Sequence, residues 1–333
     1  MNKHPFDTLS ADQRENVRSA LVAAFGSAPI GAVMPITGGA STASTFRVEV
    51  GGRGYLLRVE GQPSPLRNPL QYVSMRIAAG GGDCPGDSLH RSDRAGRGDR
   101  LHRATTAQHL SGGPPTLARA LGELISRFQA TPCFPFFVNY ADIVARLFAH
   151  VRRTGLFAEG VLDSHVKRLE QLREAYDTGL AGLVSSHNDP VPSNILFDGE
   201  RLWLIDWESA YRNDPLVDVA IVLDSLARSP ELETVLLEAW LRRTPDEALW
   251  ARLAVTRALT RLYYAGVVLS ASAAASWMTG DTDLSAPTPA ELQQAVRAGR
   301  LKPGAPQTKH VLGKMLLASF MFGVATPGFD AAV

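Results

Sequence analysis

Cysteine is scarce in this chain, because only Cys84 and Cys133 occur among its 333 residues, too few for a framework of disulfides. A surplus of one charge is also lacking, since 34 Lys and Arg residues face 33 Asp and Glu. That balance argues against nucleic acid or a polybasic membrane patch as a partner. Residues 1–16 lack the apolar core of a secretory signal. These absences predict a cytoplasmic protein.

Long hydrophobic runs are missing as well. The most apolar late stretch, residues 264–278, is short and rich in serine, which favours a buried helix over a membrane span. Apolar residues make up 45% of the chain and charged residues 20%, which is ordinary for a globular protein. The composition therefore predicts no membrane partner and enough apolar material for a two-lobed protein.

Local patterns predict a small strand-bearing part near the N-terminus. Ser10 and Gln13 have the spacing of a capping box ahead of a helix that ends near Gly26. Alternating apolar residues on both sides of a Gly-rich turn predict a hairpin over residues 45–61. Helical spacing follows over residues 68–79.

Helical periodicity dominates the chain from Pro114 onward. We therefore expect an α+β protein with two lobes, a small β-rich N-terminal lobe over residues 1–110 and a large, mostly helical C-terminal lobe over residues 111–333.

The segment between the two parts, residues 80–113, has a different character. Three Leu are its only large aliphatic residues, beside five Arg, four Asp and eight Gly. Neither a period of 2 nor one of 3.6 can be traced through it, and its composition is typical of disorder. We expect this segment to be disordered.

A polar loop inside the helical part carries the chemistry. Asp189 is followed five residues later by Asn194, and Asp206 ends a second apolar run twelve residues beyond that. The two runs, separated by a short turn, predict a hairpin that gathers these three residues at one end. Asp189 could then accept a proton from a hydroxyl, while Asn194 and Asp206 offer oxygens to Mg²⁺. This set suits phosphoryl transfer.

The loop HNDPVPSN, followed by LIDWE, resembles the catalytic motif of the aminoglycoside phosphotransferase and choline kinase superfamily. The resemblance implies a protein-kinase-like fold, ATP and Mg²⁺ as cofactors, and a small-molecule hydroxyl as the acceptor. It implies Asp189 as the catalytic base and Asn194 and Asp206 as metal ligands. His187 matches the motif's histidine, which braces the backbone, and Asp218 matches an Asp that fixes the catalytic loop.

The N-terminal part is similar to the same superfamily. The resemblance implies contacts to the nucleotide from a Gly-rich loop and from a basic strand residue with its helix partner: Gly38, Gly39, Ser41, Thr42, Arg58 and Gln71. The family usually carries Glu at the last of these positions. Gln can bond to Arg58 but cannot neutralise its charge, which speaks against full activity.

Three functions of different classes fit these residues. The sequences around Arg58 and Glu208 resemble those of choline and ethanolamine kinases, which favours an enzyme of that kind. Glu208 and Tyr211 are then candidate substrate contacts. An aminoglycoside phosphotransferase is an alternative, for which acidic residues between 231 and 247 could face a cationic substrate. A nucleotide-binding pseudokinase without turnover is the third. A protein kinase fits least, because no activation-segment pattern follows Asp206.

The length and flanks of residues 80–113 suit the two strands and the hinge that a kinase-like lobe needs there. Reading the codons of residues 80–91 and 98–113 one nucleotide further along, with suitable synonymous choices, gives strand-like apolar alternation. We therefore predict a compensated pair of frame slips in the coding DNA, and weak binding of ATP by the chain as written. Sequencing the gene tests this, because codons that forbid the shifted readings contradict it. The restored-frame protein should be the active kinase.

Overall fold

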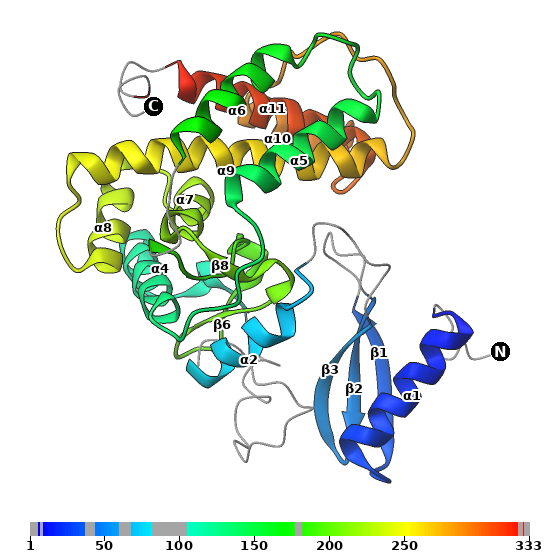
Figure 1. The fold of residues 1–333 in the computed structure, drawn as a ribbon. Coiled ribbons are helices and arrows are strands. Elements are labelled where there is room, and N and C mark those ends of the chain that lie inside the picture. The colour runs from blue at the N-terminus through cyan, green and yellow to red at the C-terminus, as the bar shows by residue number, and fades with distance from the viewer. Residues whose placement is uncertain are drawn as a thin grey trace.

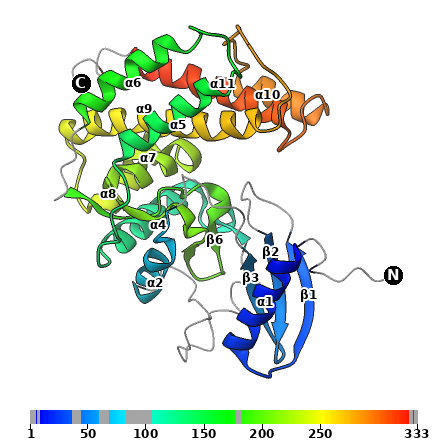
Figure 2. The same ribbon diagram turned by 45° about the vertical axis from the view of Figure 1, so that its right-hand side comes forward.

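The structure is a computed structural model, and it describes residues 6, 9–36, 44–59, 68–81, 105–176, 182–325 and 329. Figures 1 and 2 show a small sheet with one helix along its face, and a larger body built mainly of helices. This is the α+β architecture expected from the sequence, with the strands gathered early and the helices late.

The N-terminal sheet is an antiparallel meander in the order β1-β2-β3, with bounds Ile30–Ile36, Ser44–Val50 and Arg53–Val59. Helix α1 (Ala11–Phe25) begins at the predicted capping box, where Ser10 and Gln13 bond reciprocally to each other's backbone. Apolar residues of α1, of β2 and of the segment before α1 form a small core: Phe6, Leu9, Val17, Leu21, Phe46, Val48 and Val50. The predicted helix and hairpin are therefore confirmed.

Helix α2 (Gln71–Gly81) packs on the C-terminal part of the chain. Its residue Ala78 belongs to the same hydrophobic cluster as α4 (Gly113–Gln129), and Met75 and Ile77 pack against that cluster. Just before the helix, Asn68 donates from Nδ2 to the carbonyl of Ala210 at 2.6 Å. Part of the N-terminal sequence is thus built into the core of the larger body.

The expectation of disorder over residues 80–113 is wrong at both ends of that segment. Residues 80–81 complete α2, and residues 105–113 form strand β4 (Thr105–Thr106), the 3₁₀ turn η1 (Ala107–His109) and the start of α4. Backbone pairing explains the difference, because Thr105 and Thr106 pair with Phe197 and Leu196 of β6 (Ile195–Phe197). Residues 82–104 lie outside the described part of the chain.

The C-terminal body consists of helices around the 27-residue helix α9. Their bounds are α4 Gly113–Gln129, α5 Tyr140–Arg153, α6 Asp163–Ala175, α7 Pro215–Leu226, α8 Pro230–Leu241, α9 Glu247–Ala273, α10 Pro289–Arg297 and α11 Pro306–Val324. Helices α5, α7 and α11 all pack against α9. No helix in the described ranges is long and apolar enough to cross a membrane. Of the helix predicted over residues 264–278, residues 264–273 belong to α9, which ends there.

Short strands position the polar loop on this helical body. Strands β6 (Ile195–Phe197) and β7 (Leu202–Leu204) form the predicted hairpin. Strand β5 (Val184–Ser186) leads into the loop and pairs with β8 (Tyr211–Asn213). The loop is therefore held on both sides by paired backbone.

Candidate active site

The loop that follows β5 is anchored by one buried carboxylate, that of Asp218 in the first turn of α7. Its Oδ2 accepts hydrogen bonds from Ser186 Oγ at 2.7 Å and from the backbone N–H of His187 at 3.1 Å. Its Oδ1 accepts the N–H of Asn188 at 2.8 Å. Burial raises the pKa of Asp218 to about 6, and these donors oppose that rise. The contacts suit the predicted role of fixing the loop.

Asn188, which the sequence patterns do not single out, uses both its amide oxygen and its amide nitrogen in hydrogen bonds within the site. Its φ is +62°, in the left-handed region that Asn tolerates. Its Oδ1 accepts from Asn213 Nδ2 at 2.6 Å, and its Nδ2 donates to the carbonyl of Ser209 at 2.9 Å. Asn188 therefore ties the loop to the turn after β7 and to β8.

Asp189 points away from these anchors and is held by two donors. Its Oδ1 accepts from Tyr264 Oη of α9 at 2.7 Å, and its Oδ2 accepts from Asn194 Nδ2 at 3.0 Å. Burial raises the pKa of Asp189 to about 7, the charges of Asp206 and Glu208 raise it too, and the two hydrogen bonds oppose the rise. A carboxylate with a pKa near neutrality can both take and release a proton.

The hairpin register brings Asn194 and Asp206 to the same end. Ile195 pairs with Leu204, and Ile205 donates its N–H to the carbonyl of Asn194 at 3.0 Å, so Asp206 is the next residue along. Asp206 adopts a left-handed conformation with φ +63° that turns the chain away after β7. Asp189, Asn194 and Asp206 are therefore gathered as the sequence predicted.

These residues fit a magnesium ion. The amide nitrogen of Asn194 donates to Asp189. Its Oδ1 accepts a long hydrogen bond of 3.5 Å from Ser193 Oγ and keeps a second acceptor position for a cation. Mg²⁺ is typically bound by one or two carboxylates together with the phosphates of a nucleotide, so Asp206 with this amide oxygen is a suitable protein contribution. No group of three or more His, Cys, Asp or Glu within the described ranges has the arrangement of a self-sufficient metal site.

His187 is fully buried and faces the backbone of the hairpin. Its Nε2 donates to the carbonyl of Ile205 at 2.9 Å, and its ring lies 4.7 Å from that of Trp207. Burial lowers the pKa of His187 to about 4, so the ring is neutral at pH 7. These contacts agree with the role of bracing the backbone that the family resemblance implies. The carbonyl that His187 contacts belongs to Ile205, the residue directly before Asp206.

Tyrosine side chains form the wall beside Asp189. The rings of Tyr263 and Tyr264 of α9 lie 5.5 Å apart, and that of Tyr140 of α5 lies 5.7 Å from Tyr263. The hydroxyls of Tyr140 and Tyr211 are buried and find no hydrogen-bond partner among the described residues. Glu208 lies close enough for its charge to act on both Asp189 and Tyr263. The wall is thus aromatic, with hydroxyls and one carboxylate.

The predicted nucleotide contacts are described only in part. Gly38, Gly39, Ser41 and Thr42 lie outside the described residues. The backbone of Arg58 pairs with Thr45 in the sheet, and its side chain lies outside the description. Gln71 is the first residue of α2 and is buried. The pairing of Arg58 with Gln71 stays a prediction.

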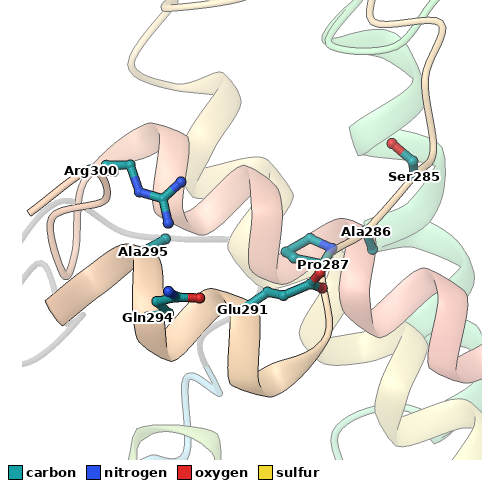
Figure 3. A pocket seen from close by; sticks show the side chains of 7 residues that line it. All are labelled: Ser285, Ala286, Pro287, Glu291, Gln294, Ala295 and Arg300. Carbon is teal, nitrogen blue, oxygen red and sulfur yellow. The ribbon is translucent and has the colours of Figure 1, made fainter. Parts of the chain in front are cut away.

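A separate open hollow of about 570 Å³ lies beside α10. Figure 3 shows Glu291, Gln294 and Ala295 of α10 lining it, with Ser285 to Pro287 and Arg300 on either side. Glu291 already bonds to Thr288 in the capping box of α10. None of the predicted site residues lines this hollow, so it forms no part of the candidate active site.

Comparison with known proteins places the chain in a family. The model of the phosphotransferase enzyme family matches residues 32–255, more than half of the chain. The chain belongs to this family. Protein LicA of Haemophilus influenzae is 43% identical over 58 residues, which are 17% of this chain and 22% of LicA. That match spans about a fifth of the relative's length.

Solved structures share the whole fold at low sequence identity. A choline/ethanolamine kinase family protein from Mesorhizobium loti has a TM-score of 0.63 and 19% identity, covering 96% of this chain and 97% of that one. A spectinomycin phosphotransferase in complex with ADP and spectinomycin has a TM-score of 0.52 and 12% identity, covering 96% and 97%. The two-lobed fold predicted by the resemblance is confirmed.

The neutral, buried His187 predicts a specific acid sensitivity. As the pH falls from 6.5 to 4, the unfolded chain binds a proton at this residue before the native protein does, so unfolding becomes more favourable. Relative to a His187→Gln variant, the wild type should lose roughly 3 kcal/mol of its free energy of unfolding across this window. Urea unfolding at a series of pH values measures the difference, and parallel curves for the two proteins contradict it.

Proposed function

We propose that this protein is a small-molecule kinase that transfers the γ-phosphate of ATP to a hydroxyl, with choline or ethanolamine as the acceptor. The observation that carries the proposal is the placement of Asp189 between Asn194 and Tyr264, beside Asp206. A base, an amide oxygen and a second carboxylate at one end of a hairpin are the groups that phosphoryl transfer needs.

In this proposal Asp189 acts as the general base. The proton of the acceptor hydroxyl passes to the Asp189 carboxylate as the hydroxyl oxygen bonds to the γ-phosphorus. The bond from that phosphorus to the bridging oxygen breaks, and ADP leaves. The elevated pKa of about 7 suits a group that must be ionised before this step and release its proton afterwards.

Asn194 and Asp206 are the residues that would hold Mg²⁺. The bound ion would neutralise charge on the phosphates during transfer. Asn194 would have two tasks in this arrangement, because its Nδ2 donates to Asp189 and its Oδ1 would be a ligand of the cation. The side chain of Asn194 therefore positions the base and would also bind the metal.

The wall beside Asp189 supports an amino alcohol as the acceptor. Aromatic faces attract ammonium groups, and the carboxylate of Glu208 adds an opposite charge. The charge of Asp189 raises the pKa of Tyr263, which places that ring near the proposed base. The fold of the choline/ethanolamine kinase family protein, with the higher TM-score of the two structures above, supports the same branch.

An aminoglycoside acceptor finds less support in the described residues. The acidic residues considered for it lie on α8 and at the start of α9, where Glu231, Glu238 and Glu247 are exposed. Glu233 is engaged with Arg257 in an ion pair of 2.9 Å. These carboxylates do not border Asp189, so they form no acidic pocket around the proposed base.

Replacement of the base tests the chemistry. Asp189→Asn should keep the fold and the binding of ATP but lower turnover by about two or more powers of ten, because the variant cannot accept the proton. Initial rates of ADP formation, with ATP binding measured by calorimetry, give the two readouts. Turnover close to that of the wild type would end the assignment of Asp189.

A panel of acceptors tests the substrate class. ATP consumption with Mg²⁺ should exceed the acceptor-free rate with choline or ethanolamine, and should not do so with neutral sugars, which lack the ammonium group that the aromatic wall attracts. Stimulation by aminoglycosides alone would move the protein to the antibiotic-modifying branch. ATP binding without stimulation by any acceptor would favour the pseudokinase.

A further inference from the structure

The contact between Tyr264 and Asp189 joins parts of the chain that are 75 residues apart. Tyr264 lies on α9, and Asp189 lies in the loop after β5. The helix itself is fixed to α7, because Arg257 and Arg261 both bond to Asp224. The Tyr264 hydroxyl therefore reaches the Asp189 carboxylate from a helix that is itself held in place by ion pairs.

Two donors lock the plane of the Asp189 carboxylate. Tyr264 Oη holds Oδ1 at 2.7 Å and Asn194 Nδ2 holds Oδ2 at 3.0 Å. Each carboxylate oxygen has two acceptor positions, so each keeps one for a further donor. With both oxygens held, rotation about the Cβ–Cγ bond is restrained, and the remaining acceptor positions keep a fixed direction.

We propose that Tyr264 is a positioning residue for phosphoryl transfer, whose hydroxyl holds the Asp189 carboxylate in the orientation that receives the acceptor's proton. The proposal rests on the function proposed above, in which Asp189 takes that proton. Tyr264 acts through Asp189 and does not itself exchange a proton with the acceptor.

The expected signature is a loss in kcat that is separate from nucleotide binding. Without the hydroxyl, the carboxylate is held at one oxygen only and spends less time in the productive orientation. Tyr264→Phe should lower kcat by about ten-fold, the scale of one hydrogen bond to a charged group. The KM for ATP should stay within about two-fold of the wild-type value, because this contact serves the base and not the nucleotide.

The chain offers a matched control in the same body. Tyr176 Oη donates to Asp214 Oδ2 at 3.0 Å, and both residues are buried. This is also a tyrosine bonded to a carboxylate, but Asp214 caps the N-terminus of α7 and takes no part in the proposed chemistry. Tyr176→Phe should cost stability in the same way as Tyr264→Phe and leave kcat unchanged.

The experiment compares wild type, Tyr264→Phe, Tyr176→Phe and Asp189→Asn in ADP formation with Mg²⁺ and saturating choline or ethanolamine. The proposal is supported if kcat falls about ten-fold in Tyr264→Phe and does not fall in Tyr176→Phe. A kcat within two-fold of wild type in Tyr264→Phe, with Asp189→Asn inactive, overturns it and leaves the kinase function intact. An equal loss in both tyrosine variants also overturns it. An active Asp189→Asn variant removes the proposed function and this proposal together.

A second measurement does not depend on turnover. Urea unfolding of Tyr264→Phe, Asp189→Ala and the double variant gives a double-mutant cycle. The effect of Tyr264→Phe should shrink when Asp189 is absent, because the hydroxyl then has no carboxylate to hold. Additive effects would show that the two side chains do not interact, and would overturn the proposal even for a preparation without activity.

Discussion

The buried carboxylate of Asp218 is the constraint on which the site depends. It receives three hydrogen bonds from consecutive residues, Ser186 to Asn188, immediately before the base. A charge at full burial is costly, as its pKa of about 6 indicates, and it is tolerated because these donors all point at it. The direction in which Asp189 leaves the loop is fixed by this contact with α7.

The same helix closes a ring of contacts around the site. Asp224, further along α7, bonds to Arg257 and Arg261 of α9. Helix α9 in turn presents Tyr264 to Asp189. Two sets of contacts therefore connect Asp189 to α7, one through the loop and one through α9. A shift of either helix would change the position of the carboxylate. Rigid elements hold a reactive group more precisely than loops can.

The part of the site that could be predicted from the sequence is the part set by local pairing. Two apolar runs joined by a tight turn require a hairpin, and the hairpin alone brings Asn194 to Asp206. The contact of Tyr264 with Asp189 could not be predicted, because helical spacing cannot tell which ring meets a carboxylate 75 residues away. Asn188 was missed because its side-chain partners, Ser209 and Asn213, come from a later turn and strand.

The N-terminal part of the chain is divided between two hydrophobic cores. The three-stranded sheet has its own core, formed by α1 and the apolar residues of β2, whereas α2 packs into the core of the C-terminal body. In the described ranges no strand pairs with β3 on the side away from β2. Residues 82–104 lie outside the described ranges, and their sequence contains Leu89 and Leu101 as its only large aliphatic residues. A strand that must pack against a sheet needs alternating apolar residues. The sequence of residues 82–104 therefore lacks the pattern that a further strand would need.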